Sequence, residues 1–284
     1  MKRLIVLIGV VGISASAVLV RWSTAPSMVL VLYRMLIATA MMAIPTLLKG
    51  REELKSMTKK ELLLTMAAGC CLGLHFSSFF ESLRHTSIAS AVILSDAEVL
   101  FVALGTIFVF HKKLSGKCWL AVGLAFVGAV LVALADVGGE NSLLGNALAL
   151  GSTLLLAMYT MIGASVRSRI SNSTYTFVAY GCAALTVLVI SLISGTPLTG
   201  YGANNWLTAL GMALLCTLMG HSVFTWGLKY LPPAYISTVK LLDPVFSALW
   251  GLLLFQEKPT LQVILGGVIV IAGVFIYGRA TEEE

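Results

Sequence analysis

Charged side chains are scarce in this chain. Asp, Glu, Lys and Arg together make up 11% of its 284 residues, whereas hydrophobic residues make up 58%. A water-soluble domain carries about 25% charged and about 45–50% apolar residues, because it needs polar side chains to cover its surface. With a mean hydropathy of +0.94, this chain has too few polar side chains for that, and a water-soluble fold is excluded.

Cysteines and signature motifs are also few. The five cysteines are an odd number, no two are spaced as C-x-x-C, and most lie within apolar runs. Neither an H-E-x-x-H motif nor a phosphate-binding G-x-x-x-x-G-K-[ST] motif occurs. The sequence therefore predicts no disulfide framework, no metal or redox site and no ATP-driven pump. We expect the protein to need no cofactor and no metal.

Basic residues outnumber acidic ones by 19 to 13, which gives a formal net charge of +6. A basic excess can attract nucleic acid. Here it lies in short loops between apolar stretches, where positive charge orients a protein in a membrane. We therefore expect a lipid bilayer and no nucleic acid as the partner.

Ten apolar stretches fill almost the whole chain. Each has close to the roughly 20 residues that cross a bilayer as a helix. The predicted spans are 4–22, 29–48, 62–80, 87–110, 118–135, 144–163, 174–194, 205–228, 233–255 and 261–278. The sequence thus predicts an all-α polytopic membrane protein with ten transmembrane helices.

Lys and Arg are distributed unevenly between the two sides of this arrangement. With the N-terminus inside, 14 of them fall in cytoplasmic segments and three in outer loops, at Arg21, Arg84 and Lys258. Positive residues concentrate on the cytoplasmic side of membrane proteins. We therefore predict a multi-pass protein of the inner cell membrane with both termini in the cytoplasm.

The chain resembles itself when it is shifted by 146 residues. The shift superimposes His75 on His221, Gly105 on Gly251 and Lys112 on Lys258. This pattern predicts two five-helix repeats, at 1–135 and 144–279. Because five is odd, the second repeat enters the membrane in the opposite sense. Inverted repeats are typical of transporters, whose substrate site lies near the midplane between the repeats.

Two opposite charges lie at similar depth in repeat-related spans. Glu98 lies in the fourth span and Lys240 in the ninth, both near the midplane at 1.5 Å of rise per residue. A charge in a span costs roughly 2.5–3.5 kcal/mol and usually faces a cavity or a partner. We predict a Glu98–Lys240 pair that lines the substrate cavity; the alternative is a structural ion pair. Gly105, Pro244 and Gly251 share these helix faces and are candidate gate residues.

Further polar and aromatic residues within spans are candidates for the same cavity. Asp96 and Asp243 are acidic neighbours of the pair, and Asp96 could pair with a polar neighbour or carry a proton. His75 and His221 could approach each other across the repeat axis, or could simply pack between helices. Arg34 could meet an anionic substrate group or extend to the membrane interface.

Two aromatic residues complete the candidate set. Tyr159 and Trp226 could stack on an organic substrate or a cation. Core packing is the alternative for both.

Several segments resemble the EamA-type exporters of the drug/metabolite transporter superfamily. They are Tyr33 to Ala38 in the second span, Ala157 to Thr160 in the sixth, Gly220 to Leu231 in the eighth, and Asp243 to Ser247 with Gln256 to Lys258, Gly266 and Gly273 near the end. The resemblance covers nearly the whole chain. One departure stands out: where the family has a proline on the fourth helix and an acidic residue near the end of that helix, this chain has Glu98 and His111.

The resemblance implies a secondary transporter that exports amino acids or related small organic metabolites by alternating access. Drug-like amines are the alternative cargo. The resemblance does not decide whether transport is coupled to a proton. An intramembrane enzyme would need a nucleophile–base pair or a metal motif. Because neither is present, we predict that the protein is not an enzyme. A membrane assembly protein is the remaining alternative class.

Overall fold

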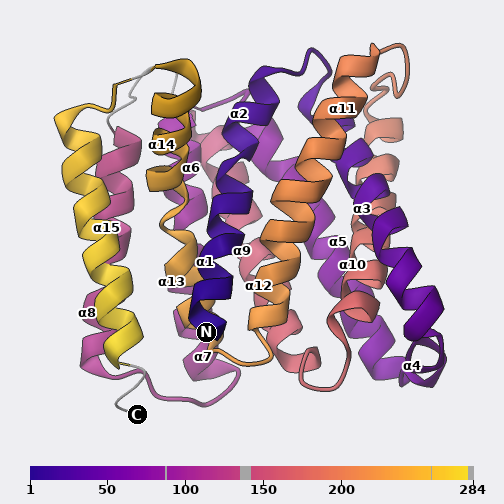
Figure 1. Ribbon diagram of the computed structural model, residues 1–284, viewed down its shortest axis with the longest axis horizontal. Coiled ribbons are helices and arrows are strands. Elements are labelled where there is room, and N and C mark those ends of the chain that lie inside the picture. The colour runs from indigo at the N-terminus through magenta and orange to yellow at the C-terminus, as the bar shows by residue number, and fades with distance from the viewer. Residues whose placement is uncertain (87, 135–141, 257, 281–284) are drawn as a thin grey trace.

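The protein is a bundle of membrane-length helices that stand side by side, with both ends of the chain at the same end of the bundle (Figure 1). This computed structural model describes residues 1–86, 88–134, 142–256 and 258–280. The described residues form helices, turns and loops without any strand. The prediction of an all-α polytopic protein is confirmed.

The helices of the two halves follow one another in the same order. The first half contains α1 (Lys2–Ser14), α2 (Ser16–Arg21), α3 (Ser27–Lys49), the short α4 (Arg51–Ser56), α5 (Lys59–Ser82), α6 (Ile88–Asp96), α7 (Glu98–Phe108) and α8 (Gly116–Ala133). The second half contains α9 (Leu143–Val166), α10 (Asn172–Ile193), α11 (Ala203–Gly211), the π-helix η2 (Met212–His221), α12 (Ser222–Gly227), α13 (Pro233–Lys240), α14 (Asp243–Phe255) and α15 (Leu261–Ala280).

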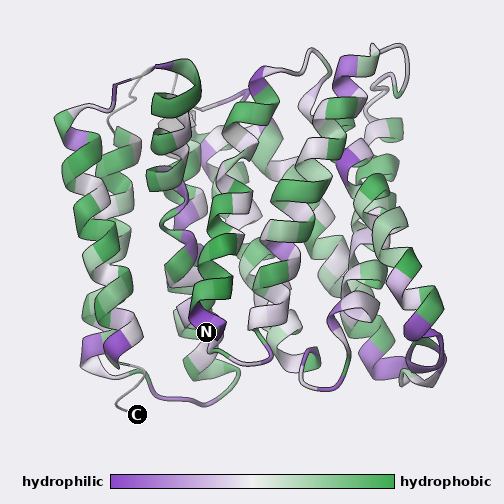
Figure 2. Ribbon diagram, in the orientation of Figure 1, coloured by the Kyte–Doolittle hydropathy of each residue, from purple (hydrophilic) through white to green (hydrophobic). Residues whose placement is uncertain are grey.

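Within the described residues, nine helices or joined helices are long and apolar enough to cross a membrane, and α8 adds a shorter apolar one. Their positions agree with the ten predicted spans, although residues 87 and 135, where two of those spans begin or end, lie outside the described residues. Hydrophobic residues cover the lengths of the helices, and hydrophilic residues gather mainly at their ends (Figure 2). The surface therefore matches a hydrocarbon environment along the helices and water at both ends.

Serine and threonine begin several of these helices. The Oγ1 of Thr58 accepts a hydrogen bond from the Glu61 N–H, and the Glu61 carboxylate accepts one from the Thr58 N–H, which closes a capping box at the start of α5. Ser142 and Ser171 cap α9 and α10, where each side-chain oxygen accepts a hydrogen bond from the backbone N–H three residues later. These caps satisfy backbone N–H groups that the first turn of a helix leaves unpaired.

Packing partners are related between the halves. α8 packs along α15 and α3 along α10, while α5 packs against α9 much as α1 packs against η2 and α12. The α8–α15 contact depends on glycine, because a Cβ on Gly128 would lie 2.7 Å from the Gly266 carbonyl oxygen. Small residues allow such close backbone approach between membrane helices. The arrangement is that of two inverted five-helix repeats.

The fourth and ninth spans are interrupted, although the sequence analysis treated each as one helix. α6 and α7 are separated at Ala97, and α13 and α14 at Leu241 and Leu242. Pro244 explains the second break: it has no N–H to donate to the Lys240 carbonyl, and the N–H of Leu241 turns back to the Thr238 carbonyl instead. The 146-residue shift places Ala97 on Asp243, so the two interruptions are related by the repeat.

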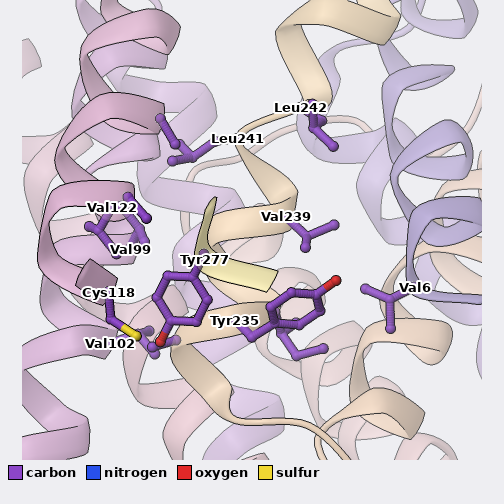
Figure 3. Close-up of a cluster of buried hydrophobic side chains, with 14 of the residues drawn as sticks. Val6, Val99, Val102, Cys118, Val122, Tyr235, Val239, Leu241, Leu242 and Tyr277 are labelled. Atoms are coloured by element: carbon purple, nitrogen blue, oxygen red, sulfur yellow. The ribbon is translucent and has the colours of Figure 1, made fainter. Parts of the chain in front are cut away.

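Buried apolar side chains hold these interrupted helices in place. A core cluster joins α1, α7, α8, α13 and α15, and includes Val6, Val99, Val122, Val239 and Tyr277 (Figure 3). Val99 follows Glu98 directly in sequence, and Val239 precedes Lys240. Glu98 and Lys240 therefore each adjoin a valine that is fully or nearly fully buried in this core, which fixes the backbone on which each charge is carried.

Candidate functional site

Glu98 and Lys240 form a buried ion pair between the two halves. The Lys240 Nζ lies 2.9 Å from Oε1 and 3.0 Å from Oε2 of Glu98. The Thr160 hydroxyl of α9 donates a third hydrogen bond to Oε1 at 2.7 Å. Only 4% of Glu98 is exposed. The carboxylate therefore has three donated hydrogen bonds in place of water.

The helix ends favour these two charges. Glu98 is the first residue of α7, and Lys240 is the last residue of α13. A helix N-terminus carries partial positive charge and a C-terminus partial negative charge, so each side chain lies at the end that stabilises it. Interrupted helices whose ends meet at mid-membrane are a recurring way to build a transporter site.

Asp96 and Asp243 lie across the two helix breaks from Glu98 and Lys240. Asp96 ends α6 and Asp243 begins α14. Asp243 accepts a hydrogen bond from the Ser247 hydroxyl at 3.4 Å, whereas the buried Oδ2 of Asp96 has no hydrogen-bond partner among the described residues. The two carboxyl groups are close enough for their negative charges to repel. The breaks therefore bring four ionisable groups into one region.

His75 and His221 lie on two sides of a phenylalanine ring. The Phe76 ring centroid is 5.1 Å from that of His75 and 5.7 Å from that of His221. His75 Nδ1 lies 2.9 Å from the Ser152 carbonyl oxygen, so this nitrogen carries the proton and donates it. Tyr159 meets the edge of His221 at 6.5 Å. Within the described residues, no three His, Cys, Asp or Glu side chains are grouped to bind a metal ion.

Arg34 lies in the protein interior. Only 4% of it is exposed, its Nε donates to the Thr217 hydroxyl at 2.6 Å, and its guanidinium lies 4.9 Å from the Phe76 ring. The interpretation that it extends to the membrane interface is wrong. The preceding Tyr33 takes a more peripheral position, stacked at 3.7 Å on Trp206, which is half-exposed.

Trp226 does not join this aromatic cluster. Its ring packs 4.9 Å from Tyr230, toward the end of the bundle that holds both termini. Among the predicted gate residues, Pro244 lies in the first turn of α14 and Gly251 is buried in the same helix. A Cβ on Gly105 would lie 2.9 Å from the terminal methyl of Met161, so α7 and α9 approach closely there.

A polar pocket opens toward the end of the bundle that holds both termini. It has a volume of about 450 Å³. Lys112, Lys113 and Lys229 line it together with Thr106 of α7. Thr106 follows Glu98 by eight residues, which is about 12 Å along a helix. The sequence analysis used these lysines to assign topology and used Lys112 to align the two repeats, but not as candidate site residues.

Polar contacts close the bundle at the same end. The Glu53 carboxylate of α4 accepts hydrogen bonds from the Ser171 N–H at 2.7 Å, from the Ser171 hydroxyl, and from the Thr174 hydroxyl at 2.6 Å. Burial alone would raise the pKa of Glu53, but these hydrogen bonds together hold it below its ordinary value. The sequence analysis missed this contact, although Ser171 and Thr174 have the spacing of a helix cap.

A second polar contact closes the opposite end. The Asn205 Oδ1 at the start of α11 accepts hydrogen bonds from the Ser23 hydroxyl and from the backbone N–H groups of Thr24 and Ala25, at 2.9 to 3.0 Å. It thereby joins α11 to the loop between α2 and α3. Each end of the bundle thus has a polar contact between the two halves.

Comparison with known proteins gives consistent matches. The chain is 26% identical over 254 residues to the uncharacterized transporter YxxF of Bacillus subtilis, covering 87% of this chain and 80% of that protein. It is also 26% identical over 205 residues to an uncharacterized transporter of Archaeoglobus fulgidus, covering 69% of each. A crystal structure with 15% sequence identity superposes with a TM-score of 0.81 over 98% of this chain and 97% of that one, which shows a shared fold.

The family model describes the same two-part organisation. The model of the EamA-like transporter family matches twice, at residues 2–134 and 143–279. This family consists of transporters, so the chain is a multi-pass membrane transporter of a small molecule and not an enzyme. Taken together with the fold and the interrupted helices, these matches show that the chain belongs to the EamA-like transporter family.

Proposed function

We propose that this transporter is a secondary carrier that exports amino acids or related small metabolites by alternating access. The observation that carries this proposal is the buried Glu98–Lys240 pair. Its members come from the two repeats and lie at the ends of interrupted helices. A substrate that separates them would bind where the repeats meet, and could be released when they rock apart.

A zwitterionic amino acid suits this pair chemically. Separating a buried ion pair leaves two uncompensated charges, which costs several kcal/mol. The ammonium group of an amino acid can replace Lys240 beside Glu98, and its carboxylate can replace Glu98 beside Lys240. An amine or a carboxylic acid alone would satisfy one charge and leave the other unpaired. The pair therefore favours a substrate with both groups.

Export requires that substrate enter from the cytoplasm. The distribution of Lys and Arg supports a cytoplasmic position for both termini in the inner membrane. The pocket with Lys112, Lys113 and Lys229 would then open to the cytoplasm. Its positive charge would attract a substrate carboxylate, and α7 would lead from it toward Glu98.

Proton coupling is the second part of the proposal. Asp96 and Asp243 repel each other when both are ionised, and a proton on either would remove this repulsion. Because the two residues flank the same breaks as Glu98 and Lys240, protonation could accompany movement of the half-helices. We assign the coupling proton to these carboxyl groups.

Counterflow in proteoliposomes tests the proposed substrate class. Radiolabelled amino acids should exchange, whereas the corresponding amines and carboxylic acids should exchange at least tenfold more slowly. Glu98→Gln and Lys240→Met should each abolish most of the exchange. The exposed charges Glu52 and Lys258 provide matched controls, and Glu52→Gln and Lys258→Met should leave it unchanged.

Other outcomes would point to the alternatives. Faster exchange of aromatic amines than of amino acids would favour an amine efflux carrier, which the rings of Phe76, Tyr159 and His221 could bind. Absence of exchange across a broad panel of small molecules would contradict the carrier proposal.

A further inference from the structure

A long apolar groove runs along the outer face of α15. It has a volume of about 690 Å³ and lies between α15 and the pair α13 and α14. Apolar side chains that line it include Val245 and Leu249 of α14 and Val263, Val268 and Phe275 of α15. α15 packs closely on α8 but makes few contacts with α14, which leaves the groove open.

The groove is long enough to hold a lipid acyl chain. Its lining on α15 extends from Val263 to Arg279, which is about 24 Å at 1.5 Å of rise per residue. One leaflet of the hydrocarbon core is about 15 Å thick. An acyl chain that starts near Arg279 can therefore lie in the groove through its whole leaflet.

Two arginines mark one end of this groove. Arg3 and Arg279 both line it, and Arg3 is held there by a hydrogen bond of 2.7 Å from its Nη1 to the Gly278 carbonyl oxygen. The Arg279 guanidinium lies over the Phe275 ring at 5.2 Å. Lys2 and Lys229 approach the Tyr230 ring at 4.3 and 5.9 Å, at the same end of the bundle but outside the lining of the groove. The two arginines therefore make this end of the groove basic, and the two lysines add positive charge to this end of the bundle.

We propose that the groove binds an anionic phospholipid, with its phosphate at Arg3 and Arg279 and an acyl chain between α14 and α15. Guanidinium groups match phosphate oxygens in charge and geometry. Basic pockets between membrane helices bind acidic headgroups, and each basic residue there contributes about fivefold in affinity. A neutral headgroup would gain little from these charges.

The end of the chain offers a competing occupant. Glu282, Glu283 and Glu284 follow Arg279 closely in sequence and lie outside the described residues. Their carboxylates could satisfy the same arginines. The experiment must therefore separate lipid binding from an intramolecular ion pair.

Native mass spectrometry of the purified full-length protein tests the proposal. Phosphatidylglycerol and phosphatidylcholine with identical acyl chains are added in equal amounts, and retained lipid is counted. We expect at least tenfold preference for phosphatidylglycerol. Arg3→Gln combined with Arg279→Gln should lower its retention about 25-fold, at about fivefold for each arginine. Arg169→Gln, an exposed arginine away from the groove, should have no effect.

A second pair of variants tests the groove itself and does not touch the arginines. A Cβ on Gly267 would lie 3.5 Å from Val245, an ordinary contact, so Gly267→Leu fills the groove without a backbone clash. It should lower retention of both lipids. Gly123→Leu on α8, where a Cβ meets nothing within 4 Å, is the control and should retain wild-type binding.

Three results would overturn the proposal. The first is equal retention of the two lipids by the wild-type protein. The second is displacement of phosphatidylglycerol by an equal concentration of free glycerol phosphate, which would indicate a simple anion site. The third is retention of phosphatidylglycerol only after Glu282, Glu283 and Glu284 are changed to Gln, which would identify the tail as the occupant.

Discussion

At the scale of single residues, the buried Glu98–Lys240 pair is stabilised by its place at two helix ends as well as by its own hydrogen bonds. Glu98 accepts hydrogen bonds from Lys240 and Thr160 and lies at the N-terminus of α7. Removal of Lys240 leaves a buried carboxylate with one neutral donor. An unpaired buried charge costs about 3–5 kcal/mol, whereas replacement of both charges by neutral groups is often nearly neutral.

This asymmetry gives a prediction for stability. Lys240→Met should lower the free energy of unfolding by about 3–5 kcal/mol, and the double change Glu98→Gln with Lys240→Met should restore most of that loss. Melting temperatures of the purified single and double variants in one detergent provide the measurement. Additive effects of the two changes would show that the charges are independent.

Glu53 provides a pH-dependent prediction. Its pKa is below the ordinary value, so its ionised form contributes stability that is present at neutral pH and lost as the pH falls through the folded-state pKa. Glu53→Gln should therefore lower the melting temperature at pH 7 and have a smaller effect near pH 4. Glu52→Gln, whose side chain is 86% exposed, should have little effect at either pH. A loss of the same size at both pH values for Glu53→Gln would contradict the assignment.

Sequence reasoning reached some of these residues and missed others for physical reasons. Glu98 and Lys240 could be matched because their depths follow from helix rise alone. The burial of Arg34 depends on its contact with Thr217, 183 residues away, and nothing local encodes it. The contact between Trp226 and Tyr230, by contrast, joins residues only four apart, a spacing at which helical side chains meet.

At the scale of elements, the interruptions of the fourth and ninth spans matter most. Hydropathy predicts where a span lies, because apolar residues must fill the bilayer, and the span positions were predicted on that basis. Hydropathy does not show whether the backbone hydrogen bonds of the helix continue without interruption through the span. Pro244 gave a local signal for the break after Lys240, but α6 and α7 separate at Ala97 without a proline. The π-helix of η2 also has no hydropathy signature.

The break at Pro244 gives the prediction at this scale. Pro244→Ala supplies an N–H for the Lys240 carbonyl and should extend α13 into α14. We expect a higher melting temperature and at least tenfold slower exchange, because a continuous helix would bend less readily. Pro45→Ala in α3 is the control, since Pro45 lies inside a helix away from the pair. Unchanged exchange in Pro244→Ala would show that the break has no role in transport.

At the scale of the whole molecule, the two halves are joined by polar contacts at both ends of the bundle and by an ion pair between those ends. The polar contacts of Glu53 and Asn205 join the halves at opposite ends, with the ion pair between them. Alternating access would require these end contacts to open in turn. The repeat boundaries at 1–135 and 144–279 remain a prediction, and part of the connection between them lies outside the described residues.

Orientation in the membrane gives a prediction for the whole molecule. In a variant without native cysteines, Thr199→Cys lies in the loop between α10 and α11 and should react with an impermeant maleimide from outside intact cells. Lys55→Cys in α4, at the opposite end, should react only after the membrane is opened. Both positions are exposed, so accessibility to solvent is matched. The reverse labelling pattern would invert the proposed topology.

An exchange of the two charges most directly separates a substrate site from a structural ion pair. Glu98→Lys combined with Lys240→Glu keeps an ion pair but reverses it, at a cost of about 1 kcal/mol for each unfavourable helix end. If the pair receives the substrate, the protein should stay folded, with amino acid exchange in proteoliposomes at least 100-fold slower. Exchange at the wild-type rate in the folded variant would show that the pair only locks the helices, and would contradict its role as the substrate site.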